Sequence, residues 1–174
     1  MAFELITTNF GGSGVRKDTL EGKEYLVVPT VMMTEGVHAG SQGAKFYSAN
    51  ELSKFPQMWD QKPIVVNHPM VDGKSISACT KEALESCRCG VLMNTKYDDG
   101  LRTEAWLDVN LCNNIDSRIV TSLLANQVME VSTGVFVDDE IVSNGFFDGK
   151  SYEKAAKNHR PDHLAILPDS KGAC

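Results

Sequence analysis

Apolar and polar residues alternate most regularly between Gln127 and Val137. Read with a period of two, one face of this predicted strand carries Met129, Val131, Thr133, Val135 and Val137, and the other carries Glu130, Ser132, Gly134 and Phe136. The apolar face is expected to contact the core, so Ser132 is expected on the opposite face, over an open patch beside a glycine. Such a serine is either a solvated hydroxyl or a nucleophile, and alternation alone does not decide between them.

Similar patterns predict strands over most of the chain. We expect them at residues 3–9, 24–33, 62–68, 88–96, 101–110 and 163–167, with turns at 138–140 and 144–145 and hairpin turns at 98–100 and 147–150. Strands in this number favour a mostly β protein with helices, of the α+β class. The specific expectation is a closed β-barrel of about seven strands surrounded by helices.

Two helices and two loops complete the pattern. Ser48 and Glu51 match a capping box and predict a helix that ends near Phe55, before Pro56. Asn113 or Asn114 is expected to cap a second helix, which carries apolar residues at 115, 119 and 123. Residues 34–43, which include His38, and residues 70–85 are expected to be loops, the first of them mobile.

Composition narrows the class of protein. The chain has 174 residues, of which 42% are hydrophobic and 23% charged, and these values suit a single domain over 1–174. The net charge of −6 leaves no basic footprint, so nucleic acid is not an expected partner. No apolar run is long enough for a membrane helix, and the N-terminus does not read as a signal peptide. The protein is therefore expected to stay where it is made, away from membranes.

The five cysteines favour reduced thiols, because their number is odd and no secretory signal is expected. Cys87 and Cys89 are too close together for a zinc knuckle, and the chain has no second such pair. A small metal-binding protein using Cys87, Cys89 and a histidine remains an alternative. The favoured expectation is that the protein needs no metal or organic cofactor.

Two histidines are placed where they could serve Ser132. His68 ends a predicted buried strand, and Pro69 holds it extended as it leaves the sheet. His163 points away from the core, as Ser132 does, if Leu164 and Ile166 point into it. A serine hydroxyl needs a base within hydrogen-bond reach, and that base needs a partner that fixes its tautomer. Spacing alone does not show that the three side chains meet.

These residues lie in segments that resemble a known family. Asn67-His68, the strand 131–135 and the segment 163–167 resemble the three motifs of the herpesvirus assembly proteases, or assemblins. The segment 160–165, Arg-Pro-Asp-His-Leu-Ala, is similar to the last motif of a group of tailed-phage proteins. From about Thr34 onward the chain thus resembles a tailed-phage head maturation (prohead) protease related to the assemblins, and an assemblin-like barrel is the fold that this resemblance implies.

The resemblance implies roles for individual residues. Ser132 would be the nucleophile, His68 the general base and acid, and His163 the residue that orients His68. Because many phage head proteases use a carboxylate as the third member, Asp162 and Glu130 are rivals of His163. The backbone at Lys171 and Gly172 would hold the oxyanion, with a side-chain role for Lys171 left open. His159 is expected to be solvated or on the substrate side.

The resemblance also implies an activity and a place of action. A serine endopeptidase of this type would cleave phage scaffold and major capsid proteins, and itself, inside the prohead in the host cytoplasm, as a monomer or as a homodimer or higher oligomer. Cys174 is a candidate for the acyl side of a self-cleavage site, and an artificially truncated end is the alternative. From another functional class, the competing hypothesis is a catalytically silent barrel domain that binds capsid or scaffold proteins.

Overall fold

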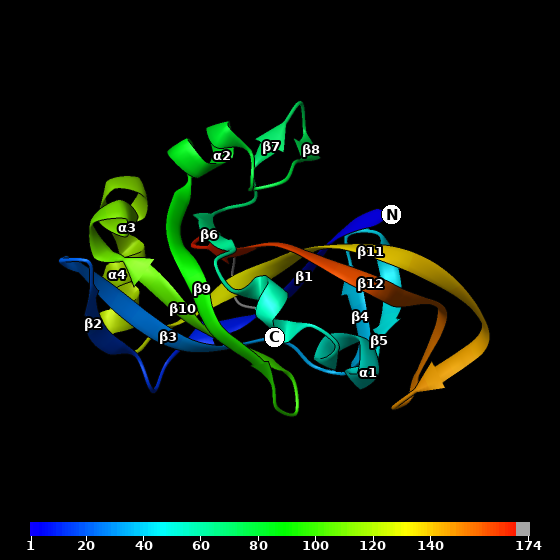
Figure 1. Ribbon diagram of the computed structural model, residues 1–174. Helices are drawn as coiled ribbons and strands as arrows, with labels where there is room; N and C mark the ends of the chain where they lie inside the picture. The colour runs from blue at the N-terminus through cyan, green and yellow to red at the C-terminus, as the bar shows by residue number, and fades with distance from the viewer. Residues whose placement is uncertain (170–174) are drawn as a thin grey trace.

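The computed structural model describes residues 1–169 and shows a mixed α+β protein made mostly of strands (Figure 1). Its strands are β1 (Ala2–Gly11), β2 (Arg16–Leu20), β3 (Lys23–Met33), β4 (Gly36–Gly40), β5 (Gly43–Tyr47), β6 (Pro63–Val66), β7 (Met70–Val71), β8 (Lys74–Ser75), β9 (Arg88–Tyr97), β10 (Leu101–Asp108), β11 (Val128–Phe147) and β12 (Lys150–Leu167). The helices are α1 (Ala49–Ser53), α2 (Lys81–Ser86), α3 (Val109–Asp116) and α4 (Arg118–Leu124), with a 3-10 turn at Pro56–Trp59.

Ten of these strands form one sheet. Neighbouring strands follow the order β1-β11-β12-β6-β9-β10-β3-β2, and β5 pairs with both β12 and β4. Within residues 1–169 this order does not return from β2 to β1, so a closed barrel remains a prediction. The strands outnumber the seven expected because polar segments, such as β2 and the β4–β5 hairpin, pair along the sheet without an alternating apolar pattern.

The longest strands of the sheet are β11 and β12, which are much longer than expected and curve together at the right of Figure 1. The predicted turns at 138–140 and 144–145 are wrong, because both segments lie inside β11. Charges in the first segment pair across to β12: Asp138 contacts Arg160 at 2.9 Å and Glu140 contacts Lys157 at 3.2 Å. The Asn144-Gly145 signal coincides with an irregular register instead of a turn. The predicted hairpin at 147–150 is confirmed.

Two predicted loops contain regular structure. Residues 34–43 include β4 and the start of β5, where Gly36 pairs with Tyr47 and Gly40 with Gly43. Residues 70–85 include the β7–β8 hairpin and most of α2, which stand above the sheet in Figure 1. Glycine-rich and polar composition suggested loops at both places, but backbone pairing does not require apolar side chains.

The helix starts are partly as expected. Ser48 accepts a hydrogen bond from the Glu51 amide at 3.3 Å, which confirms the first cap. The caps expected at Asn113 or Asn114 are wrong, because Asp108 caps α3 five residues earlier, by accepting from the amides of the second and third following residues. The structure has two helices, α3 and α4, where a single helix was expected, and α4 begins after Ser117.

Two apolar clusters lie on opposite faces of the sheet where β6 and β12 pair. The larger one is the main core and includes Val131, Val135 and Ile166. The smaller one, which we call the outer cluster, consists of Val65, Ala78 and Ala165. Since Ala165 and Ile166 are neighbours in β12, they point to opposite faces, as alternation requires. The candidate site lies on the face of the outer cluster.

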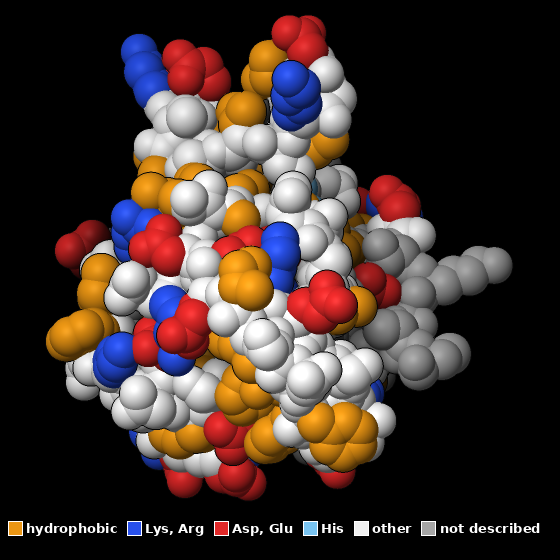
Figure 2. All heavy atoms as spheres, turned by 90° about the vertical axis from the view of Figure 1, so that its right-hand side faces the viewer, with side chains coloured by type: hydrophobic (Ala, Val, Ile, Leu, Met, Phe, Trp, Pro, Cys, Tyr) orange, Lys and Arg blue, Asp and Glu red, His pale blue; other side chains and the backbone are white. Residues whose placement is uncertain are grey.

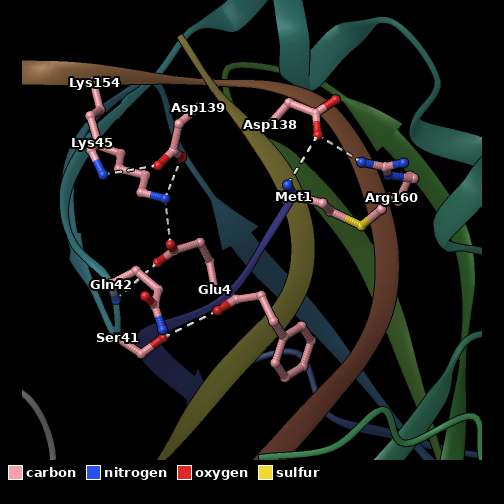
Figure 3. Close-up of polar contacts among 10 residues, drawn as sticks. Met1, Glu4, Ser41, Gln42, Lys45, Asp138, Asp139, Lys154 and Arg160 are labelled. Carbon is pink, nitrogen blue, oxygen red and sulfur yellow. Dashed lines mark hydrogen bonds and ion pairs between the residues drawn. The ribbon is translucent and has the colours of Figure 1, made fainter. Parts of the chain in front are cut away.

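A buried charge network joins the N-terminal strand β1 to β5 and β11 (Figure 3). The ammonium group of Lys45 lies 2.6 Å from the Glu4 carboxylate and 2.5 Å from that of Asp139, while Lys154 contacts Asp139 at 3.0 Å. Lys45 and Glu4 are fully buried. Burial alone would lower the pKa of Lys45, but the two carboxylates outweigh it and the pKa is raised.

The visible surface carries charges of both signs, interspersed over the face shown in Figure 2. No helix in the described part of the chain is long and apolar enough to cross a membrane.

Candidate active site

Ser132 lies near the start of β11, between Thr7 of β1 and Ala165 of β12. It points away from the main core, as alternation predicted, and toward the face of the outer cluster. The expected open patch is wrong, because Ser132 is only 1% exposed. The covering is local: Ala165, directly opposite Ser132, packs with Val65 and Ala78.

Gly134 makes room for His163. The two residues are directly paired across β11 and β12. A Cβ atom at position 134 would lie 2.5 Å from Cε1 and 2.7 Å from Nδ1 of the His163 ring, which is closer than packing allows. The glycine two positions after Ser132 therefore allows an imidazole to lie flat against the strand that carries the hydroxyl.

An irregularity in β12 allows two consecutive residues, Asp162 and His163, to contact each other on this face. Gly134 pairs with His163 and the next residue, Val135, pairs with Pro161, so Asp162 is an extra residue, as in a β-bulge. In a regular strand, Asp162 and His163 would point to opposite faces. Here Oδ2 of Asp162 lies 2.6 Å from Nδ1 of His163, and both side chains are buried.

His68 reaches the same place from β6, which runs parallel to β12. The amide of Asn67 donates to the carbonyl of Ile166 at 2.9 Å and extends this pairing by one residue. Asn67 then adopts a φ of 61°, a left-handed conformation that asparagine tolerates better than most residues. The chain turns there, and Nδ1 of His68 lies 2.8 Å from Nε2 of His163. Asn67 belongs to the first motif of the resemblance, but its left-handed backbone and the reason for an asparagine there were not predicted from the sequence.

The Asp162 carboxylate is held by the segment that follows His68. Oδ1 accepts a hydrogen bond from the Ser77 hydroxyl, and Oδ2 accepts one from the Ala78 amide at 2.8 Å. Burial by itself would raise the pKa of Asp162, but the hydrogen bonds from His163, Ser77 and Ala78 outweigh it and lower the pKa. Asp162 is therefore an anion at neutral pH.

An anionic Asp162 decides which nitrogen of each imidazole donates and which accepts a hydrogen bond. Its Oδ2 accepts from Nδ1–H of His163, and in that tautomer Nε2 of His163 is an acceptor. That acceptor receives Nδ1–H of His68, so the remaining nitrogen of His68, Nε2, carries a free lone pair. We call this row, His68 with His163 and Asp162, the His–His–Asp chain.

His68 is held neutral. Burial, and secondarily the proximity of His163, lowers its pKa to about 4. At neutral pH its Nε2 is then available to accept a proton, which is what a general base requires.

Ser132 is near this chain but not joined to it. Within residues 1–169 its side chain makes no hydrogen bond to His68 or to His163. Its position is diagonal to His163, since it lies two residues before Gly134 on the same face, and diagonal neighbours are about 7–8 Å apart. The structure thus brings His68, His163 and Asp162 together. The Ser132 hydroxyl lies beside them on the same face, without a hydrogen bond to them.

The remaining candidates lie elsewhere. Of the two carboxylates considered as rivals of His163, Asp162 bonds to the His163 ring, whereas Glu130 makes no hydrogen bond to His68 or His163 in the described structure. Asp162 and His163 are hydrogen-bonded in series with His68, so both stay predicted candidates for the third member. Lys171, Gly172 and Cys174 lie outside the described residues.

The two other histidines, His38 and His159, flank the ring of Tyr47. The ring of His38 lies 5.7 Å from the Tyr47 ring, and that of His159 lies 5.6 Å from it. His159 is half-buried, its Nε2 is inaccessible and burial lowers its pKa, so it is not a freely solvated histidine; a place on the substrate side stays a prediction. His38 contacts the carbonyl of Thr34 at 2.8 Å, within its own hairpin.

The cysteines do not form a metal centre in the described part of the chain. Cys89 is buried in the main core, while Cys87 packs against the outer cluster on the other face. No group of three or more potential ligands among His, Cys, Asp and Glu converges within residues 1–169. The opposite orientation of the two thiols argues against the metal-binding alternative.

Comparison with known proteins identifies a fold. No family model matches the sequence, and no curated protein does. Among solved structures, the chain is similar to the bacteriophage T4 capsid assembly protease gp21, with a TM-score of 0.63 over 95% of this chain and 98% of that one. The identity is 10%. At that level, what the two proteins are shown to share is their fold.

Proposed function

We propose that this protein is a serine endopeptidase of phage head assembly. In this proposal it cleaves scaffold and major capsid proteins, and itself, through an acyl-enzyme at Ser132. The observation that carries the proposal is the His–His–Asp chain, in which His68 contacts His163 and His163 contacts Asp162 on the face of β11 that carries Ser132. A structural role alone does not require a buried imidazole hydrogen-bonded to both a buried carboxylate and a second, half-buried imidazole.

The proposed reaction steps follow from which nitrogen atoms of His68 and His163 donate and which accept. Oγ of Ser132 attacks the scissile carbonyl carbon while its proton passes to Nε2 of His68. The resulting imidazolium is stabilised through Nδ1–H by His163, which Asp162 in turn orients. His68 then gives the proton to the leaving amine, and water hydrolyses the acyl-enzyme by the same route in reverse order. The backbone at Lys171 and Gly172 is proposed to hold the oxyanion.

The proposal includes a change at Ser132 before the reaction. The hydroxyl is buried and not yet bonded to His68, so its rotamer and the covering residues must shift when substrate binds. Catalytic hydrogen bonds often form only in the substrate complex. A protease that acts once in each assembling particle gains from such a resting state, because early cleavage would destroy the scaffold.

The structural relative supports the proposed setting. The T4 protein of the same fold is a capsid assembly protease, which makes capsid-related proteins the proposed substrates and the viral prohead in the host cytoplasm the proposed location. Assembly as a homodimer or higher oligomer, and a closed assemblin-like barrel, belong to the same proposal.

Labelling with a fluorophosphonate tests the nucleophile. We expect the wild-type protein to be labelled at Ser132, as located by peptide mass mapping, and we expect Ser132→Ala and His68→Ala to lose labelling. Ser151→Ala, which changes an exposed serine of β12, is the matched control and should label normally. Labelling that persists in Ser132→Ala would show that the mechanism is wrong.

A catalytically silent capsid- or scaffold-binding domain is the second candidate, and the burial of Ser132 favours it. Such a domain would show no labelling and no cleavage when mixed with scaffold protein, while still binding it. The same mixture therefore separates the two functions.

A further inference from the structure

Segment 67–80 contacts two consecutive residues of β12. It supplies His68, which bonds to His163, and it also supplies the groups that bond to Asp162. Near its start, His68 bonds to His163, and near its end, Ser77 and Ala78 bond to Asp162. Because Asp162 and His163 are consecutive residues of the irregular stretch of β12, one segment closes on a single point of the sheet. The segment that supplies the proposed base thus also holds the carboxylate that acts on it.

Ser77 is itself oriented for this contact. Its oxygen accepts a hydrogen bond from the Cys79 amide at 3.1 Å, so its proton is free to point at Oδ1 of Asp162. The other carboxylate oxygen, Oδ2, receives the Ala78 amide and Nδ1 of His163. Ser77 is the donor found on Oδ1, and it therefore fixes the rotation of the carboxylate that keeps Oδ2 facing the ring.

We propose that Ser77 is a positioning residue of the peptidase, which acts on His68 through Asp162 and His163. The inference rests on the proposed function and adds a residue to it that does not touch substrate. Without the Ser77 hydroxyl, the carboxylate can rotate and binds a proton more readily, since a hydrogen bond to the charged form is lost. His163 is then less firmly held in the tautomer that accepts from His68.

The test compares Ser77→Ala, Ser77→Thr and a control, Ser75→Ala, by the rate of fluorophosphonate labelling between acidic and neutral pH. Ser75 lies in the same segment, but its hydroxyl donates to the sulfur of Met70 and not to the His–His–Asp chain. We expect Ser77→Ala to label about tenfold more slowly at neutral pH, a rise in the barrier of about 1.4 kcal/mol, because His163 and His68 are held less firmly. We also expect the acidic side of its pH–rate profile to move to higher pH, because the pKa of Asp162 rises. Ser77→Thr keeps the hydroxyl and should recover most of the rate, and Ser75→Ala should match wild type.

A spectroscopic readout separates positioning from folding. The proton on Nδ1 of His163, bonded to a carboxylate, should give a far-downfield proton resonance, which Ser77→Ala should shift or broaden while the rest of the amide spectrum stays folded. If Ser77→Ala labels at the wild-type rate over the whole pH range and leaves this resonance unchanged, the positioning role is wrong. If wild type and Ser132→Ala label equally, the proposed function itself fails. The two failures are therefore distinguishable.

Discussion

At the scale of single residues, the site depends on the absence of a side chain at Gly134 as much as on the imidazole of His163. The ring occupies space that a Cβ atom at position 134 would need. The same holds at Gly145, where a Cβ atom would lie 2.5 Å from the ring of Tyr152, far along the same strand. Two glycines of β11 thus make room for two rings of β12, but only one of these rings is in the candidate site.

This pair gives a matched prediction. We expect Gly134→Ala to displace the His163 ring, abolish serine-directed labelling and lower the free energy of unfolding by about 1–3 kcal/mol, as overpacking does. Gly145→Ala should cost stability through the same kind of clash but leave labelling intact. Urea unfolding and labelling of both variants provide the measurements. Normal labelling in Gly134→Ala would contradict the placement of His163 in the reaction.

At the scale of elements, the N-terminal strand β1 is joined to the sheet by charge as well as by backbone pairing. Lys45 of β5 lies between Glu4 of β1 and Asp139 of β11, with no exposure to solvent (Figure 3). A buried ammonium group between two carboxylates is costly to bring out of water. Removing one partner leaves the others uncompensated, whereas replacing a whole group with apolar side chains is often neutral.

We therefore expect Lys45→Met to lower the free energy of unfolding by roughly 3–5 kcal/mol, because the buried Glu4 carboxylate loses its counter-charge. Adding Glu4→Leu to Lys45→Met should restore part of that loss. Lys17→Met, which removes an exposed ion pair with Glu24, serves as the control and should change stability by less than about 1 kcal/mol. Denaturant unfolding of the four proteins checks this, and equal stability of Lys45→Met and wild type would show that the network does not hold β1.

At the scale of the whole molecule, burial of the candidate site links folding to pH. His68 has a pKa of about 4 in the folded protein and about 6.5 when exposed. Between these values the unfolded chain binds a proton that the folded protein does not. The contribution of His68 is thus fully present above pH 6.5 and is lost as the pH falls toward 4. Asp162, whose folded pKa is also lowered, extends the loss to still lower pH.

The predicted result is a fall in the free energy of unfolding of about 3 kcal/mol between pH 6.5 and pH 4 that is due to His68, since each pKa unit corresponds to 1.36 kcal/mol. His68→Gln should show a correspondingly smaller fall. Urea titrations of both proteins across this window measure the difference. If the two proteins lose stability in parallel, His68 titrates normally in the folded state and its burial has no such effect.

How much could be read from the sequence is clearest at particular positions. Alternation in β11 correctly put Val131, Val135 and Val137 in the core and Ser132 on the other face, because a strand must point neighbouring side chains to opposite sides. The same reasoning could not show that this other face is covered. Nor could it show that Asp162 and His163 act on one side, because the irregularity that permits this exists only in the pairing of β12 with β11.

By itself, then, the sequence determined the kinds of residue that can do chemistry and the faces on which regular strands present them, since both follow from local covalent geometry. Tertiary structure alone decided that His68, 95 positions away from His163, meets it at 2.8 Å, and that Ser77 and Ala78 hold the carboxylate behind them. The physical reason is that such contacts depend on how β6 and β12 lie side by side, which is set by backbone pairing and by the packing of the whole sheet.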